Sequence, residues 1–273
     1  MPKIRIIPVI LLKNNNIVQS RSFLEHKIVG DPIVIVDRLS SWNADEIIYL
    51  NISSEPKQAI NRIDLRNKYN LSFLEIVKKM SKYCFAPLTV GGGITNINDA
   101  RKYLDSGADK ICINSNSYNY KLIEECAKKF GSQAIVISID VKKNKKEWDI
   151  YFNGGLNKYN LSLKNHIKFC QDNGAGEILV NSIDRDGSYL GYDIKLLEKV
   201  LAYSNIPIIA LGGAGSWDHM YDCVKKLNIS AIAASNIFHH SENSYYNAIS
   251  FLKKKKINVR NPILNKFKTL KGL

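Results

Sequence analysis

The sequence has few of the features that mark secreted, membrane-spanning or metal-binding proteins. Its five cysteines are odd in number, widely spaced and include no C-x-x-C pair, which argues against both a disulfide framework and a zinc site. The N-terminus has no signal-peptide core, and no apolar run approaches the roughly 20 residues of a membrane span. The five histidines have no metal-ligand spacing with carboxylates. We therefore expect a reduced, cytoplasmic protein without metal, cofactor or membrane association.

Negative charge is also scarce. The chain has 39 Lys and Arg residues against 25 Asp and Glu, a net charge of +14, which favours anionic partners such as phosphorylated metabolites. Basic runs lie at residues 142–146, at 253–256 and in a tail over 261–273. Because no aromatic residues interleave with them in an RNA-binding pattern, nucleic acid is not an expected partner. We predict one domain over residues 1–260, followed by the basic tail.

Short apolar runs alternate with amphipathic stretches from end to end. The runs are rich in Ile and Val and nearly continuously apolar, as buried parallel strands are: 5–11, 46–51, 87–90, 110–114, 134–140, 177–181, 207–211 and 231–234. Helical patterns cover 31–42, 72–83, 96–105, 121–130, 162–173, 194–203, 217–227 and 244–255. Eight strands alternating with eight helices predict an α/β fold, the (β/α)8 TIM barrel, with a doubly wound open sheet as the alternative.

The two halves of the chain repeat each other. Gly91-Gly-Gly93 is echoed by Gly212-Gly213, and Glu46 by Glu177, at separations of about 120 to 130 residues. Such a repeat favours a closed barrel built from two half-barrels. It is broken at one position: Asp140 ends the fifth predicted strand, whereas its counterpart in the first half is Leu11.

Two Gly-rich turns follow the third and seventh predicted strands, and each leads into a helix. Glycine lets backbone N–H groups approach an anion, and the helix end adds a favourable dipole. Asn114-Ser115 and Ala234-Ser235 end the next strands and bring hydroxyls beside these turns. Each half therefore predicts one phosphate cradle, which indicates a substrate phosphorylated at both ends. Plain tight turns are the alternative interpretation.

Two acids are candidates for the chemistry of the catalytic face. Asp140 lies at a strand end and should point into the mouth of the barrel. Asp186 lies in the polar segment after the sixth strand, where Asp186-Gly187 either binds the second phosphate through a backbone amide or is only a turn. General acid/base chemistry often needs two groups of different pKa, and Leu11 cannot move a proton.

Charged residues also stand where strands begin. They are Arg5, Glu46, Lys110 and Glu177. Charges at that end of a barrel usually serve stability. The alternative is a salt-bridged ring closing the barrel axis, and spacing does not distinguish the two.

Several stretches together resemble a known family, the cyclase subunit of imidazole glycerol phosphate synthase. The resemblance runs from about residue 4 to about residue 260 and includes Arg5-Ile-Ile-Pro8, Thr89-Val-Gly-Gly-Gly-Ile94, Phe130-Gly-Ser-Gln133, Ser182-Ile-Asp-Arg-Asp-Gly187 and Gly212-Gly-Ala-Gly215.

The resemblance implies a mechanism and partners. A class I glutaminase docks on the N-terminal face as a heterodimer, and its ammonia crosses the barrel through a gate matched by Arg5, Glu46, Lys110 and Glu177. The ammonia is added to a bisphosphorylated ribulosyl aminoimidazole carboxamide, and cyclisation and lyase cleavage give imidazole glycerol phosphate and an aminoimidazole carboxamide ribotide. The matching site residues are the acid Asp140, one phosphate site of Gly93, Asn114 and Ser115, and a second of Gly187, Gly213, Ala234 and Ser235.

The chain departs from the family pattern at three positions. The family's other catalytic acid falls on Leu11, its acid at the end of strand two on Asn51, and a lysine of the mobile first loop on Gln19. Removing one of two acid/base groups typically costs ~10²–10⁴ in rate. A divergent branch with the same leucine is associated with surface-polysaccharide biosynthesis, where the barrel passes ammonia to a sugar-amidinating enzyme. Two hypotheses therefore stand: a cyclase/lyase of histidine biosynthesis, or an ammonia-conducting subunit without cyclase activity.

Overall fold

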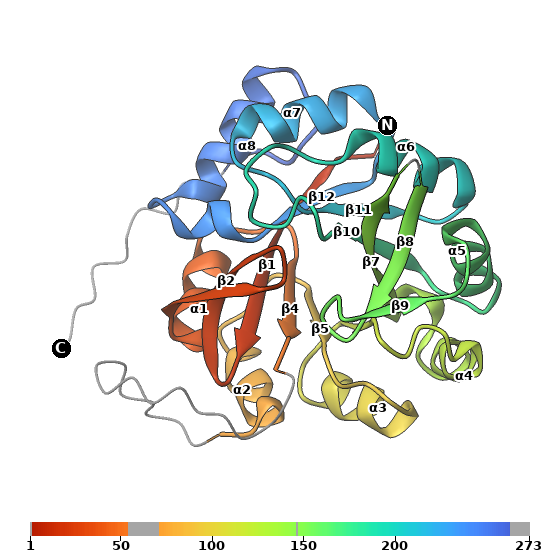
Figure 1. Cartoon of the computed structure of the whole chain (residues 1–273). Helices are drawn as coiled ribbons and strands as arrows, with labels where there is room; N and C mark the ends of the chain where they lie inside the picture. Colours follow the sequence, from red (N-terminus) through yellow and green to blue (C-terminus); the bar gives the residue numbers. More distant parts are fainter. Residues whose placement is uncertain (1, 54–70, 146, 263–273) are drawn as a thin grey trace.

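The chain folds into a closed barrel of parallel strands surrounded by helices (Figure 1). The computed structural model describes residues 2–53, 71–145 and 147–262. Within them the barrel strands are β1 (Arg5–Lys13), β4 (Ile47–Asn51), β5 (Leu88–Gly91), β6 (Lys110–Ile113), β7 (Ile135–Asn144), β10 (Glu177–Ser182), β11 (Ile208–Leu211) and β12 (Ala231–Ala234). Each pairs in parallel with its neighbours, and the pairing of β10 with β7 closes the circle. The predicted TIM barrel is confirmed.

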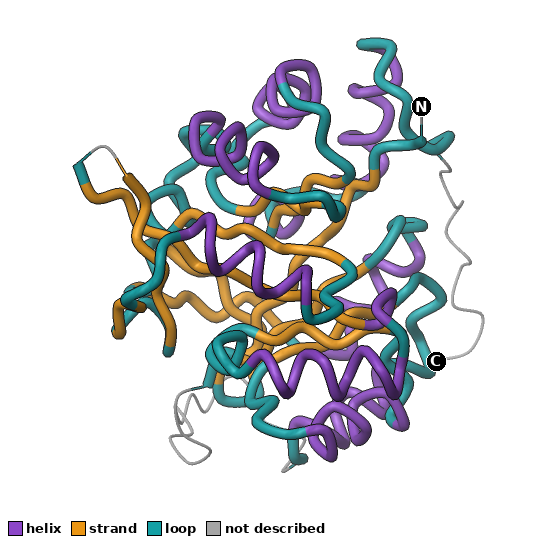
Figure 2. Tube along the Cα trace, turned by 90° about the vertical axis from the view of Figure 1, so that its right-hand side faces the viewer, coloured by secondary structure: helices purple, strands orange, loops and turns teal. Residues whose placement is uncertain are grey.

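Helices follow the strands and cover the outside of the barrel, as the tube in Figure 2 shows. They are α1 (Pro32–Ser41), α2 (Phe73–Met80), α3 (Ile97–Asp105), α4 (Tyr120–Phe130), α5 (Leu163–Asp172), α6 (Ile194–Tyr203), α7 (Trp217–Lys226) and α8 (Ser244–Lys254), with short 3-10 turns at η1 (Ser132–Ala134) and η2 (Asn236–His239). The Asp31 carboxylate caps α1 by accepting from Ile33 N–H at 2.8 Å, because side-chain oxygens satisfy the first free amides of a helix. Asn119 caps α4 in the same way.

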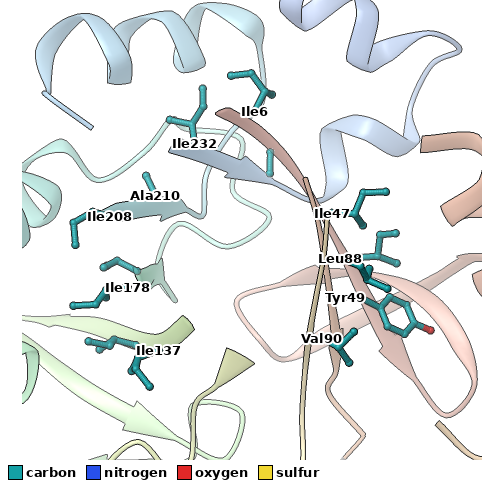
Figure 3. Close-up of a cluster of buried hydrophobic side chains, with 14 of the residues drawn as sticks. Ile6, Ile47, Tyr49, Leu88, Val90, Ile137, Ile178, Ile208, Ala210 and Ile232 are labelled. Carbon is teal, nitrogen blue, oxygen red and sulfur yellow. The ribbon is translucent and has the colours of Figure 1, made fainter. Parts of the chain in front are cut away.

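Apolar side chains point to both faces of each barrel strand. Those on the outer face, such as Ile6, Ile47, Ile137 and Ile208, pack beneath the helices (Figure 3). Those on the inner face fill the interior of the barrel, which we call the lumen: Ile7, Val9, Ile48, Cys112, Val136, Leu179, Ile209, Ala231 and Ala233. Burial on both faces explains why the strands read as continuous apolar runs.

Two antiparallel extensions were not expected from the sequence. β2 (Asn16–Arg21) and β3 (Glu25–Gly30) continue β1 as a meander, and β8 (Glu147–Phe152) and β9 (Asn157–Tyr159) continue β7. The β1–β2 turn is Asn14-Asn15, both with positive φ (49° and 61°), which is the conformation that tight hairpins need and asparagine tolerates. Both extensions leave the barrel at the carboxyl ends of its strands, an end that we call the mouth.

The basic tail predicted over 261–273 lies, apart from its first two residues, outside the described residues, so the domain boundary stays a prediction. In the described part of the chain no helix is long and apolar enough to cross a membrane.

Candidate active site

The four charged residues at the strand starts meet in one cluster, which we call the ion-pair ring (Arg5, Glu46, Lys110 and Glu177). The Arg5 guanidinium contacts Glu46 at 2.8 Å and also binds Glu177. The Lys110 ammonium lies 3.2 Å from Glu46 and 2.7 Å from Glu177. Each cation thus bridges both carboxylates, and the four side chains form a closed circuit at the amino end of the lumen.

The two carboxylates of the ion-pair ring are buried. The side chains of Glu46 and Glu177 are only 3% and 11% exposed, and Thr89 Oγ1 donates a further hydrogen bond to Glu46 at 2.8 Å. Burial alone would raise the pKa of Glu177, but its hydrogen bonds and charge interactions with Arg5 and Lys110 hold it below the ordinary value. The Glu177 carboxylate is therefore kept ionised at the end of an apolar interior.

At the mouth, Asp140 is a buried acid, 7% exposed. Asn114 Nδ2 donates to its Oδ2 at 3.0 Å and also to the carbonyl of Ser138. Burial, with a smaller contribution from the negative charge of Asp186, raises the pKa of Asp140 to about 7, although hydrogen bonds from Asn114 and Asn181 oppose the rise. Such a carboxyl can both give and take a proton near neutral pH.

The break in the internal repeat is visible in the strand register. Asp140 of β7 lies beside Asn181 of β10, whereas Leu11 of β1 lies beside Leu50 of β4. Leu11 and Leu50 pack against the lumen residues. One half-barrel therefore presents an acid and an amide at the mouth, and the other presents two leucines.

Asn51 takes no part in that apolar pair. It is in register with Leu12, one position beyond Leu11, and its Oδ1 accepts from Ser53 N–H at 3.1 Å. Gln19 lies on β2, where its Nε2 reaches the carbonyl of Asn236 at 3.5 Å.

Asp186 is half-buried and bonded to the β2–β3 hairpin. Its Oδ2 accepts from Ser20 Oγ at 2.6 Å and from Phe23 N–H at 3.2 Å. Its own amide donates to the carbonyl of Ser182 at 2.9 Å, inside the turn. Burial raises the pKa of Asp186, although the bonds from Ser20 and Phe23 oppose this. The carboxylate thus joins the loop after β10 to the hairpin after β1.

The second predicted phosphate cradle is a small cavity. It is lined by Asp186, Gly187, Tyr189, Leu211, Gly212, Gly213, Ala214, Ala234, Ser235 and Asn236. A Cβ on Gly213 would overlap the carbonyl oxygen of Gly191, and its φ of +98° is one that glycine adopts freely. The buried oxygens Asn181 Oδ1, Ser182 Oγ and Ser235 Oγ have no partner among the described residues. Unpaired buried polar atoms of this kind indicate a place for a ligand or water.

The first cradle is arranged differently. Gly92 and Gly93 have φ of +110° and +68°, and a Cβ on Gly93 would meet open space. Ser115 Oγ accepts from Asn153 N–H of the β8–β9 turn at 3.3 Å. The predicted residues Asn114 and Ser115 therefore lie together, beside Asp140, with one hydroxyl already bonded.

Sequence reasoning missed the residues that the hairpins bring to the mouth, namely Ser20, Phe23 and Asn153. The alternation of Trp148, Ile150 and Phe152 with polar residues was the available signal for β8. The contacts themselves join residues far apart in the chain, which no local pattern predicts. Among the described residues no group of three or more His, Cys, Asp or Glu side chains is placed to hold a metal ion.

Comparison with known proteins identifies the family of this chain. A family model described as "Histidine biosynthesis protein" matches residues 5–244. The chain belongs to this family. It is 41% identical over 258 residues to the imidazole glycerol phosphate synthase subunit HisF of Dictyoglomus thermophilum, covering 94% of this chain and 98% of the relative. It is 38% identical over 257 residues to the subunit of the same name from Natranaerobius thermophilus, and 39% over 259 residues to that of Clostridium botulinum strain 657, with the same coverage. The resemblance to HisF subunits noted from the sequence is thus confirmed over nearly the whole chain.

Proposed function

We propose that this chain is the ammonia-using barrel subunit of a glutamine-dependent synthase of the HisF type. Ammonia released by a class I glutaminase enters past the ion-pair ring, crosses the apolar lumen and reaches the mouth. There it is added to a bisphosphorylated ribulosyl aminoimidazole carboxamide, which is cyclised and cleaved. The observation that carries the proposal is the alignment of three parts along one axis: the ring, the apolar lumen and the buried acid Asp140.

The two ends of the barrel would have different roles, ammonia entry at the ring and substrate binding at the mouth. The ring excludes bulk water from the apolar lumen because its four charges form ion pairs with one another. A small neutral molecule such as ammonia needs no ion-pair partner there. At the mouth, Gly93, Asn114 and Ser115 would hold one phosphate, and Gly187, Gly213, Ala234 and Ser235 the other. The unpaired Ser235 hydroxyl and the cavity that Ser235 and Gly213 line support an anion site on that side.

The glutaminase would dock at the ring end. Phe85 precedes β5 at that end and is 89% exposed, with its amide bonded to Ser40 Oγ at 2.9 Å. An exposed aromatic side chain on a fixed backbone is a typical interface anchor. It supports a protein partner at this face.

The test supplies ammonium salt and the ribulosyl substrate to the purified chain and follows formation of imidazole glycerol phosphate. We expect turnover in the wild type and loss of ~10²–10⁴ of the rate in Asp140→Asn. Absence of turnover from the folded wild type would refute the cyclase assignment.

A second function is favoured by one specific observation, the leucine pair at the mouth. Leu11 and Leu50 extend the apolar lining to the exit of the lumen, which suits a subunit that conducts ammonia to another enzyme, such as one that amidinates a sugar in surface-polysaccharide biosynthesis. A wild type that is inactive alone, but whose glutaminase-derived ammonia reaches a sugar-amidinating enzyme, would favour this alternative. Recovery of cyclase activity in Leu11→Asp would instead identify the missing acid as the single defect.

A further inference from the structure

Two carboxyl groups lie on the same side of the mouth. Asp140 ends the inner face of β7, and Asp186 follows β10, the strand that pairs with β7 in the barrel. They are close enough for the charge of Asp186 to act on Asp140. The opposite side, formed by β1 and β4, presents Leu11 and Leu50. Asp186, on the side of Asp140, is therefore the candidate for a second acid at this mouth.

Asp186 is held in a way that suits proton transfer. Both hydrogen bonds that described residues give to this carboxylate end on Oδ2, from Ser20 Oγ and Phe23 N–H. The residue also lines the cavity that contains Gly213 and Ser235. Because a carboxylate repels a phosphate, the Asp186 side chain is a poor phosphate ligand. It nevertheless lies beside the predicted phosphate cradle, where it can reach a bound substrate.

We propose that Asp140 and Asp186 form one coupled acid/base pair. This pair carries out the two-acid chemistry to which Leu11 cannot contribute. This inference rests on the proposed cyclase function. At the start of the proton step Asp140 carries the proton and Asp186 is ionised. Asp140 gives its proton to a substrate oxygen or nitrogen, and Asp186 takes one proton from a substrate N–H or C–H. The pair keeps one proton and one negative charge throughout, and it resets when that proton returns to Asp140 through water.

The electrostatics agree with the geometry. Burial raises the pKa of both acids, and the negative charge of Asp186 adds to the rise at Asp140. Asp140 also faces the Cys112 thiol of β6, which stays neutral because burial raises its pKa to about 12. The groups bonded to Asp186, Ser20 and the Phe23 amide, do not titrate in this range. Near neutral pH Asp140 therefore keeps its proton more readily than an ordinary carboxyl does.

The first measurement is ammonium-dependent turnover against pH. Asp186→Asn should lower kcat by ~10²-fold or more, change the substrate KM little, and remove one limb of the pH profile. The control is Asp184→Asn, an exposed acid two residues away whose Oδ2 accepts the Lys143 amide at 2.7 Å, and it should stay within about twofold of wild type. A second control, Ser20→Ala, removes a hairpin bond but keeps the acid, and should preserve the shape of the pH profile.

The second measurement is independent of turnover. Carbon-13 NMR of labelled aspartate follows the titration of Asp140, whose apparent pKa should fall by about one unit in Asp186→Asn because a neighbouring negative charge is removed. An unchanged Asp140 titration, or Asp186→Asn with a wild-type rate and pH profile, overturns the pair. A wild type without turnover overturns the cyclase function instead, and the titration then decides alone whether the pair exists.

Discussion

The ion-pair ring allows a quantitative prediction about Arg5. Its guanidinium bridges Glu46 and Glu177, so Arg5→Met leaves two buried carboxylates with Lys110 as their only remaining cation in the ring. Breaking a buried ion pair by removing one partner typically costs about 3–5 kcal/mol, because an uncompensated charge stays buried. For a chain of this size that corresponds to a fall in Tm of roughly 6–15 °C.

The effect should depend on pH with a defined sign. In the wild type the pKa of Glu177 is held below its ordinary value of 4.5, so its contribution to stability is present above that value and is lost as pH falls through the depressed pKa. Without Arg5 burial dominates and the pKa of Glu177 rises, so the penalty is present at neutral pH and is relieved as the carboxyl takes up a proton. The difference between wild type and variant should therefore shrink from pH 7.5 to pH 5.

The assay is urea unfolding of both proteins at these two pH values, compared through midpoints and slopes. The matched control is Lys128→Met, which breaks an exposed i,i+4 pair with Glu124 on α4; exposed pairs are typically worth about 0–1 kcal/mol. An Arg5→Met variant no less stable than Lys128→Met, or a difference from wild type that grows toward pH 5, would refute the reasoning.

Three further outcomes follow from the structure. Because burial raises the pKa of Asp140 from 3.8 to about 7, its ionisation opposes folding increasingly as pH rises between those values and fully above about 7, so Asp140→Asn should stabilise the protein by up to about 4 kcal/mol at pH 8.5 but only by about 1–2 kcal/mol at pH 5, as thermal unfolding at each pH will measure. Phe85→Ala should weaken glutaminase binding by about 10- to 100-fold in calorimetry, whereas Leu24→Ala, equally exposed at the mouth end, should not. Gly213→Ala should cost about 2 kcal/mol or more and abolish inorganic phosphate binding at the second cradle, while Gly93→Ala, whose Cβ meets open space, should cost only about 1 kcal/mol from its positive φ.

The barrel strands were predictable from the sequence because both faces of each strand are buried. β12, for example, is apolar and buried at every position, β10 is buried at all but one, and the runs at 177–181 and 231–234 matched them closely. The hairpin strands carry a weaker signal. β3 has no fully buried residue, and β2 is set by the asparagine turn at 14–15 rather than by a hydrophobic pattern.

The site was predictable as far as strand ends determine it. Glu177 begins β10 as expected, whereas β7 continues past Asp140 to Asn144; both could be assigned to an end of the barrel because parallel strands bring like ends together. The partners of Asp186 were not, since Ser20 lies 166 residues away and reaches it only through the hairpin. The strand register, which places Leu50 rather than Asn51 beside Leu11, also could not be predicted without the structure.

The loss of symmetry at the mouth has a physical consequence for the acid that remains. Leucines at 11 and 50 contribute neither hydrogen-bond donors nor charge to the space that Asp140 faces, so that space hydrates an ionised carboxylate poorly. The two leucines therefore favour the protonated form of Asp140, while Asn114 opposes the shift by donating to it. Asp140 is left with a pKa of about 7, which suits a group that must both give and take a proton near neutral pH. The asymmetry argues against acid/base chemistry from two sides of the mouth. It also favours an Asp140 that can both give and take a proton.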